Sequence, residues 1–255
     1  MPSSDQTESS HEAHLICLHG FLGLHSDWDL IAPFAPNPWR VHHVNLWNQI
    51  SDLRTWSENF CREMRELEGT KVLLGYSMGG RLAMHALAED RDLFSGAVLV
   101  SANPGLKNEE EKRVRLVADQ VWADKFRKLE WGELLTQWNS QNVFNQPANL
   151  GKDSVTLDRE ESKFDRELLA ESMELWSLGF QVDFEPLLKE LEMPILFVTG
   201  RSDSKFTTLA ANLVSHPAWG DRPHVIVEKA GHRVPWDSPQ DFRSILAKFL
   251  ARWYR

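Results

Sequence analysis

Short apolar runs alternate with longer helical stretches along most of the 255-residue chain, and this alternation limits the possible folds more than any other feature. Runs of this kind, rich in β-branched residues, are typical of strands buried in a parallel sheet, with helices as the crossovers between them. Six strands are expected, at residues 14–19, 41–47, 71–76, 96–102, 194–200 and 224–230. Helical stretches lie near 53–68, 78–90, 205–216 and 238–253. The pattern predicts an α/β fold with a mostly parallel sheet flanked by helices.

Residues 105–190 interrupt this alternation. The segment is rich in charged and aromatic side chains, has helix-like spacing and contains no convincing strand. No Pro/Gly/Ser-rich linker flanks it, so we interpret it as a helical cap inserted between two strands of one sheet. Residues 14–255 are therefore predicted to form a single domain, and the polar residues 1–13 a disordered tail.

Composition and charge narrow the classes of function. The 42% hydrophobic and 25% charged residues are ordinary for a globular protein. No apolar run reaches the roughly 20 residues that span a bilayer, and the N-terminus lacks the pattern of a signal peptide, so the cytoplasm is the expected location. The net charge of −9 argues against a nucleic-acid partner. The sequence contains no signal for an oligomeric state.

The two cysteines, Cys17 and Cys61, lie in an apolar strand and in a helical pattern, where core packing is their expected role. No group of His, Cys and carboxylate residues has the spacing of metal ligands. Neither a metal nor another cofactor is expected.

The segment KVLLGYSMGGRLAMHAL contains a G-x-S-x-G motif, Gly75-Tyr76-Ser77-Met78-Gly79, between an apolar strand and a helix. In the α/β-hydrolase fold this arrangement is the nucleophile elbow, a sharp strained turn that presents the serine at the carboxyl end of the sheet. Small residues two positions before and after the serine let strand and helix approach closely. A dinucleotide-binding turn needs G-x-G-x-x-G and a later acidic residue, and this segment does not supply them.

A nucleophilic serine needs N–H donors for the charge that develops on a substrate oxygen. The backbone N–H of Met78, directly after the serine, is one expected donor. The loop after the first strand, with the sequence HGFLG, is expected to supply the second through the N–H of Phe21. His19 in this loop is interpreted as a structural residue.

The remaining triad members are expected in the order acid, then histidine. Asp203 follows the strand that ends at Gly200, and His232 follows the last strand, so Ser77, Asp203 and His232 form the predicted catalytic triad. The serine needs a base to accept its proton, and the aspartate would hold the imidazole in the required tautomer. Rival residues of the right type do not follow a strand directly; they are His216, His224, Asp183 and Asp221.

Several segments together resemble one family of α/β-hydrolases over residues 14–250, nearly the whole chain. They are HGFLG, GYSMGGR, SANPGL, the D-S-K-F after Gly200, and AGH. The chain is similar to the 2-succinyl-6-hydroxy-2,4-cyclohexadiene-1-carboxylate (SHCHC) synthases of menaquinone biosynthesis. The resemblance implies a lyase that removes a ring proton beside a succinyl ketone and expels pyruvate, with the triad as base.

The substrate of that family has three carboxylates, so the resemblance also implies cationic residues in the pocket, for which planar guanidinium groups are well suited. The substrate-binding residues that it implies are Tyr76, Arg81, Arg115, Trp138 and Arg159.

The chain departs from common α/β-hydrolase patterns in three places. Residues 44–49 read VNLWNQ where D-x-P-G-H-G is usual, Lys112 stands where the family's cap has an arginine, and Trp236-Asp237 replace a His-x-Glu pairing. Two alternatives therefore remain open. One is a carboxylesterase or carbon–carbon bond hydrolase acting on an aromatic or apolar substrate; the other is a catalytically silent binding protein, against which the intact triad argues.

Overall fold

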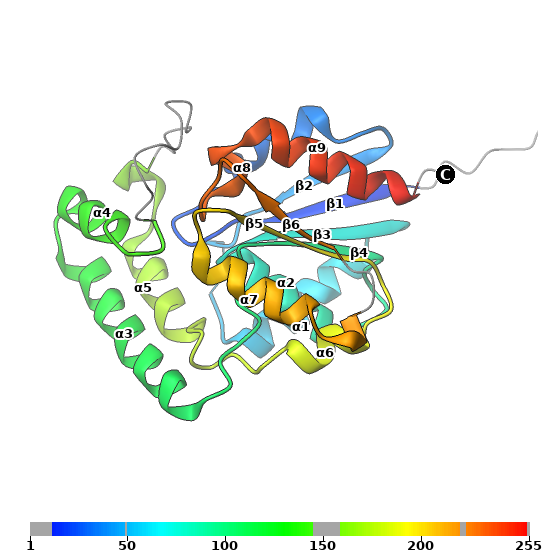
Figure 1. The fold of residues 1–255 in the computed structure, drawn as a ribbon. Helices are drawn as coiled ribbons and strands as arrows, with labels where there is room; N and C mark the ends of the chain where they lie inside the picture. The colour runs from blue at the N-terminus through cyan, green and yellow to red at the C-terminus, as the bar shows by residue number, and fades with distance from the viewer. Residues whose placement is uncertain (1–11, 49, 145–158, 220–222, 254–255) are drawn as a thin grey trace, which may run out of the picture.

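The computed structural model describes residues 12–48, 50–144, 159–219 and 223–253. Six strands form one parallel sheet in the order β2-β1-β3-β4-β5-β6 (Figure 1). Their bounds are Ala13–Leu18 (β1), Trp39–Val44 (β2), Thr70–Tyr76 (β3), Gly96–Val100 (β4), Ile195–Gly200 (β5) and His224–Val227 (β6). The predicted α/β fold is confirmed and all six expected strands are present, although β2 and β6 each end three residues earlier than expected. The strand β1 begins at Ala13, one residue earlier than expected, and residues 1–11 of the expected tail lie outside the described residues.

Helices cover both faces of the sheet, and the side chains of the inner strands are therefore buried on both sides. The helices α1 (Leu53–Arg65), α2 (Met78–Glu89) and α7 (Ser204–Val214) cover one face, and α9 (Pro239–Leu250) with the short α8 (Val234–Asp237) covers the other (Figure 1). All four expected helical stretches are present. Three short 3₁₀ helices lie at His25–Leu30 (η1), Ala32–Phe34 (η2) and Pro217–Trp219 (η4), and another, η5, ends the described chain at Ala251–Trp253.

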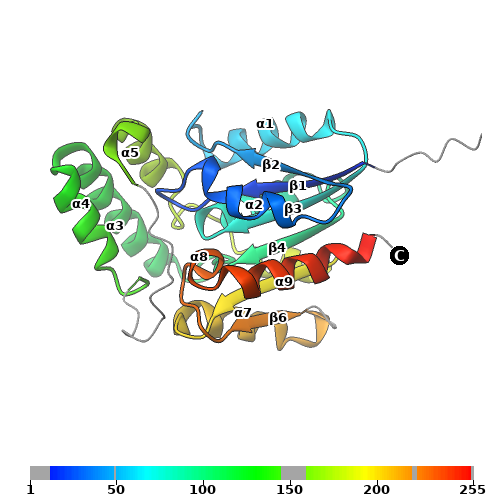
Figure 2. The same ribbon diagram turned by 90° about the horizontal axis from the view of Figure 1, so that it is seen from above.

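The insertion between β4 and β5 forms a separate layer of helices at one end of the sheet (Figure 2). It contains α3 (Glu109–Lys128), α4 (Trp131–Asn139), η3 (Glu161–Lys163) and α5 (Arg166–Leu175). The helix α6 (Glu185–Glu190) also falls within the span expected for the cap, but it contacts η4 and lies with the helices that cover the sheet. Its buried Leu188 belongs to the core on that side, which explains the difference.

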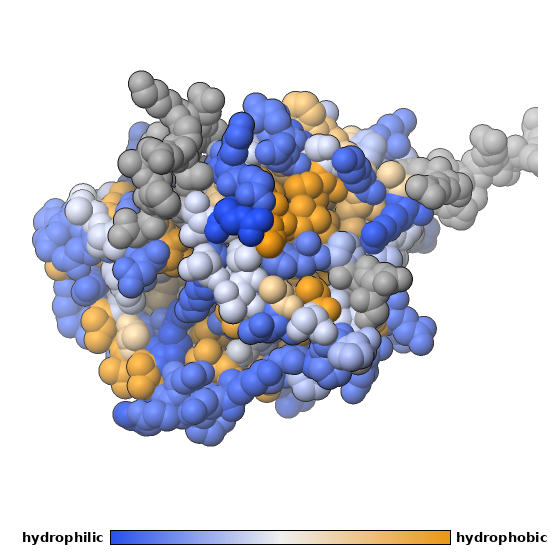
Figure 3. Space-filling model, viewed as in Figure 1, coloured by the Kyte–Doolittle hydropathy of each residue, from blue (hydrophilic) through white to orange (hydrophobic). Residues whose placement is uncertain are grey.

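The surface seen in Figure 3 is mostly hydrophilic, with hydrophobic atoms in small separate groups. Exposed large apolar side chains are concentrated in the segment between β4 and β5; those of α3 are Val114, Val117 and Val121. Among the described helices, none combines the length and the apolar character that a bilayer crossing requires.

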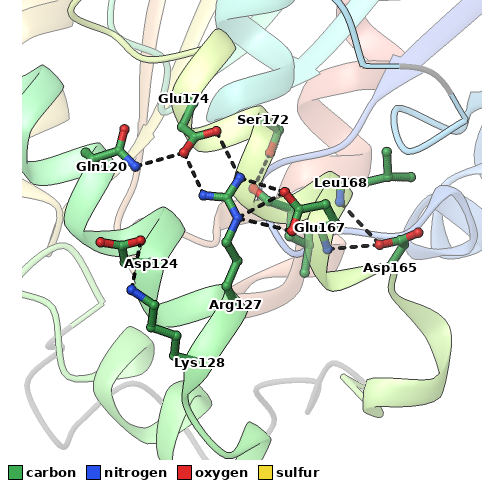
Figure 4. Close-up of polar contacts among 10 residues, drawn as sticks. Gln120, Asp124, Arg127, Lys128, Asp165, Glu167, Leu168, Ser172 and Glu174 are labelled. Atoms are coloured by element: carbon green, nitrogen blue, oxygen red, sulfur yellow. Dashed lines mark hydrogen bonds and ion pairs between the residues drawn. The ribbon is translucent and has the colours of Figure 1, made fainter.

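A charged network joins the two long helices of the cap (Figure 4). The guanidinium of Arg127 on α3 donates to Glu167 of α5 at 2.7 Å and to Glu174 of α5 at 2.6 Å. Gln120 donates to the same Glu174 oxygen at 2.8 Å. Only 26% of the Arg127 side chain is exposed, so this network is screened by solvent less than an ordinary surface pair.

We predict that Arg127→Met destabilises the protein by about 1–2 kcal/mol, because one substitution removes hydrogen bonds to two carboxylates and leaves them facing each other. Lys128→Met is the matched control, since Lys128 forms an exposed pair with Asp124 within one helix at 3.3 Å. That control is expected to change the free energy of unfolding by less than about 0.5 kcal/mol. Denaturant unfolding of both variants measures the difference, and equal effects would contradict the prediction.

Candidate active site

Ser77 lies in a strained turn between β3 and α2, with φ 52° and ψ −110°. A positive φ is uncommon for a residue with a side chain. The N–H of Ser77 donates to the carbonyl of Val100 in β4 at 2.8 Å, which fixes the turn to the sheet. A Cβ atom on Gly79 would lie 2.2 Å from the carbonyl oxygen of Leu18, so the close approach of α2 to β1 requires glycine there. The turn therefore has the steric features expected of a nucleophile elbow.

The three residues of the predicted triad are hydrogen-bonded in a row. Ser77 Oγ lies 3.0 Å from His232 Nε2, and His232 Nδ1 lies 2.6 Å from Asp203 Oδ2. His232 and Asp203 are only 2% and 4% exposed. The imidazole can thus donate its Nδ1–H to the carboxylate while Nε2 accepts the hydrogen of the serine hydroxyl, which is the arrangement that general-base catalysis needs.

The loops after β5 and β6 bring Asp203 and His232 together. A Cβ atom on Gly200 would lie 2.2 Å from the carbonyl oxygen of Gly231, so these two loops pack directly on each other. The N–H of Gly231 also donates to Asp237 at 2.9 Å. Burial raises the pKa of Asp237. The carboxylate of Asp237 thus holds the backbone beside His232, at the place where the sequence departs from the His-x-Glu pairing.

Aromatic rings surround the imidazole of His232. The ring centroids of Phe206, Tyr76 and Phe144 lie 4.6, 5.6 and 5.6 Å from it. These contacts restrict the rotation of the imidazole and keep water from most of its surface.

Two of the rival residues are hydrogen-bonded elsewhere. His224 is hydrogen-bonded to the hydroxyl of Thr199 at 2.7 Å, and Asp183 accepts a hydrogen bond from the N–H of Glu185 at 3.0 Å. His216 follows the end of α7, and Asp221 lies outside the described residues.

The two residues expected to supply oxyanion-hole donors, Phe21 and Met78, line the same cavity as Ser77. Met78 is the first residue of α2, and the first N–H groups of a helix have no acceptor within the helix. A Cβ atom on Gly20 would lie 3.5 Å from the Cβ of Ser77, which places the loop containing Phe21 next to the serine. β1 and β3 are neighbours in the sheet although β2 lies between them in sequence, and ligands of α/β sheets bind at such a switch in strand order.

His19 is buried, and both of its ring nitrogens have partners. Its Nδ1–H donates to the carbonyl of Gly20 at 2.9 Å, and its Nε2 accepts the N–H of Leu46 at 3.2 Å. Burial lowers the pKa of His19 to about 3, so the ring stays neutral. These contacts agree with the structural role expected from the sequence. They also assign a role to two residues of the unusual VNLWNQ segment. The N–H of Leu46 binds His19, and the Nε1–H of Trp47 donates to the carbonyl of Gly23 at 2.6 Å, so both residues bind the loop after β1.

A cavity of about 510 Å³ lies between the cap and the carboxyl ends of the strands. Ser77, His232 and Asp203 line it on the side of the sheet. Aromatic and amide side chains line much of the rest; they include Phe21, Trp138, Phe144, Trp176, Asn103 and Gln141. The cavity is large enough for a substituted six-membered ring.

Arg81 from α2 and Arg115 from α3 both reach the cavity. The guanidinium of Arg81 donates to the carbonyl of Trp176 at 2.8 Å, and among the described residues it forms no ion pair. Burial lowers the pKa of Arg81 to about 9, and the charge of Arg115 adds to this. Arg115 is bound through Nε to Asp119 at 2.8 Å, an interaction that leaves its terminal nitrogens for another partner.

The three other residues implied by the resemblance differ in whether they line the cavity. Trp138 lines the cavity and is 9% exposed. Tyr76 is not among the lining residues; it packs beneath His232 and against Trp236 at 4.8 Å, and burial raises its pKa. Arg159 is also absent from the lining, because its guanidinium is bound to Asp27 of η1 at 2.7 Å. Lys112, the other departure in the cap, pairs with Glu109 in the preceding turn.

Two charged lining residues were missed by the sequence reasoning. Asp119 is 3% exposed and accepts hydrogen bonds from Arg115 and from Ser177, at 2.8 and 2.7 Å. Lys205 lies two residues after Asp203, at the start of α7. Its place in the D-S-K-F segment, directly beside the triad aspartate, was the signal that could have found it.

The sequence of residues 15–245 matches the alpha/beta hydrolase family. The chain belongs to that family. Among curated members of the family, the SHCHC synthase of Pectobacterium atrosepticum is 30% identical over 246 residues and that of Serratia proteamaculans 29% over 245 residues. These alignments cover 93% and 92% of this chain and the same shares of the relatives.

Several solved structures share the fold. MenH from S. aureus superposes with a TM-score of 0.82 at 20% identity, covering 95% of both chains. A thermophilic esterase from Thermogutta terrifontis gives 0.72 at 17% identity, covering 94% of this chain and 90% of its own. At these identities the likeness concerns the fold, which is common to enzymes of different activity.

We predict that Ser77 reacts covalently with a fluorophosphonate probe, because its hydrogen bond to His232 makes the oxygen nucleophilic. Mass spectrometry should locate the label on Ser77, and Ser77→Ala should remain unlabelled. Asp203→Asn should slow labelling by at least about 100-fold, since the imidazole loses its required tautomer. Ser244→Ala, on the exposed side of α9, is the control and should label at the normal rate. Rapid labelling of Ser77→Ala would contradict the assignment.

Buried histidines should also make stability depend on pH. Burial lowers the pKa of His85 on α2 to about 3, helped by the charge of Arg81, whereas the unfolded chain takes up that proton near pH 6.5. The contribution of His85 is therefore complete above pH 6.5 and is lost as the pH falls towards 3. His85→Phe should reduce the slope of unfolding free energy against pH, between pH 6 and 5, by up to about 1.4 kcal/mol per unit.

His25→Phe is the matched control, because it makes the same substitution at an exposed position. Denaturant unfolding at several pH values measures the slopes. An unchanged slope in His85→Phe would show that His85 does not titrate on unfolding.

Proposed function

We propose that this chain is an SHCHC synthase: a lyase that eliminates pyruvate from 2-succinyl-5-enolpyruvyl-6-hydroxy-3-cyclohexene-1-carboxylate in menaquinone biosynthesis. One observation carries the proposal, namely that a serine–histidine–aspartate row opens into the same cavity as cationic groups without full ion pairing. The curated relatives, aligned over more than nine tenths of the chain, are named for this activity.

The proposed reaction begins with proton transfer. His232 Nε2 accepts the hydroxyl proton of Ser77, and the serine oxygen removes the ring proton beside the succinyl ketone. Asp203 stabilises the imidazolium that results. Electrons from the broken C–H bond move into the ketone, forming an enolate, and then through the ring double bond to break the C–O bond to the enolpyruvyl group. The released enolpyruvate takes up the proton held by the imidazolium of His232 to become pyruvate, which returns the triad to its starting state, and the ring becomes the 2,4-diene.

The enolate needs stabilisation where its negative charge develops. The backbone N–H groups of Phe21, from the loop next to Ser77, and of Met78, the first residue of α2, are proposed to bind that oxygen. Each such donor is typically worth about 2.7–4 kcal/mol of transition-state stabilisation. The closed environment of the aromatic rings around His232 strengthens these interactions by excluding water.

Arg81 and Arg115 are proposed to bind carboxylates of the substrate. Arg81 approaches the cavity without a carboxylate partner among the described residues, and Arg115 shares only its Nε with Asp119. Groups held in this way are preorganised for an anion, because little rearrangement is needed when it binds. The cytoplasm is the proposed location, which the two unpaired, buried cysteines support.

The decisive assay offers the purified protein the enolpyruvyl tricarboxylate and, in parallel, a panel of aryl esters. Pyruvate release from the first substrate is expected, with slow or no alcohol release from the esters. Ser77→Ala should lower the rate of pyruvate release by at least about 1,000-fold with an unchanged thermal midpoint, because it removes the base while keeping the backbone of the turn. Ester hydrolysis without pyruvate release would instead assign the site to a hydrolase.

A further inference from the structure

Lys205 is a cation in an electrostatically unfavourable place. It lies in the first turn of the eleven-residue helix α7, where the helix dipole disfavours positive charge. Lys205 is an exposed residue that lines the cavity, and its partial burial, with the charge of Arg115 across the cavity as a second cause, lowers the pKa of Lys205. Asp203 and Glu111 act in the opposite direction, but among the described residues Lys205 forms no ion pair with either.

Contacts within the protein do little to hold the ammonium of this lysine, which belongs to an exposed residue. Within the part of the chain that the structure describes, the polar partner of this ammonium is the ring of Phe206, whose centroid is 5.7 Å away, near the outer limit of a cation–π interaction. A cation held near another cation and at a helix N-terminus is typical of a site prepared for an anion, because an anionic ligand turns each of these repulsions into an attraction.

The cation expected from the resemblance is already neutralised. Arg159 was expected to contact substrate, but both of its terminal nitrogens donate to Asp27, at 3.1 and 2.7 Å, and only 14% of the side chain is exposed. Transferring Arg159 to the substrate would leave Asp27 without this partner in a largely buried position, a costly exchange.

We propose that Lys205, in place of Arg159, is the third cation of the substrate site and binds one carboxylate of the tricarboxylate. This inference rests on the proposed function. Arg81, Arg115 and Lys205 come from three different elements, α2, α3 and α7, and converge on one cavity. Three separate positive charges match a ligand with three separate carboxylates, and they disfavour neutral esters that would leave those charges unpaired.

The test compares the kinetics of pyruvate release in Lys205→Met, Lys205→Arg and Arg159→Met. Lys205→Met should raise KM for the tricarboxylate by about 10- to 100-fold, the usual range for losing a hydrogen bond to a charged group, while kcat changes less than KM. Lys205→Arg should restore most of the affinity, which a structural role for the lysine stem would not require. Lys248→Met, on the exposed side of α9, removes an equal charge outside the cavity and should leave KM unchanged.

Arg159→Met should lower the thermal midpoint, because it leaves Asp27 unpaired, and should raise KM less than Lys205→Met does. The inference is overturned if Lys205→Met has the KM of the unaltered protein, or if Arg159→Met has the larger effect on KM. If the unaltered protein releases no pyruvate from the tricarboxylate, the proposed function fails, and this inference fails with it. The two failures are thus distinguished by the activity of the unaltered protein.

Discussion

The site depends on a single hydrogen bond, 3.0 Å long, between side chains that are 155 residues apart in the sequence. It forms because a parallel sheet brings the ends of β3, β5 and β6 to the same edge, and because the loops there pack closely enough to need glycine. The strain of Ser77 at φ 52° is maintained by its backbone bond to β4. Without the sheet, neither the turn nor the imidazole would keep its orientation.

Features set by local sequence could be predicted, and features set by long-range pairing could not. The strands and the elbow follow from apolar runs and from glycines at fixed offsets, so the sequence located all six strands and the residues of the hydrogen-bonded row. The partner of Arg159 is Asp27, 132 residues away, and no local pattern contains that pairing. The same limit explains α6, whose membership in the sheet-covering layer depends on contacts with η4, and Lys205, whose importance depends on Arg115 across the cavity.

The arginines in and around the cap differ in how many carboxylate hydrogen bonds their guanidinium groups make. This difference distinguishes the arginines that hold the structure together from those proposed to bind substrate. Arg127 is bound to two carboxylates and joins helices. Arg159 is bound to the carboxylate of Asp27 through two nitrogens. Arg115 shares only its Nε, and Arg81 binds a carbonyl and an amide. A protein with a net charge of −9 can in this way present a cationic cavity, because the local pairing of each group decides the field that a ligand meets.

The imidazole of His19 links two parts of the molecule that are otherwise separate. One ring nitrogen holds the carbonyl of Gly20, next to the amide proposed to stabilise the enolate, and the other holds the amide of Leu46, just beyond the edge strand of the sheet. Because burial lowers the pKa of this ring to about 3, the ring is neutral at neutral pH and its Nε2 can accept that hydrogen bond. The segment after the edge strand β2 is thereby connected through His19 to the loop that contains Phe21. Substitutions in that segment would therefore alter the alignment of the substrate oxygen.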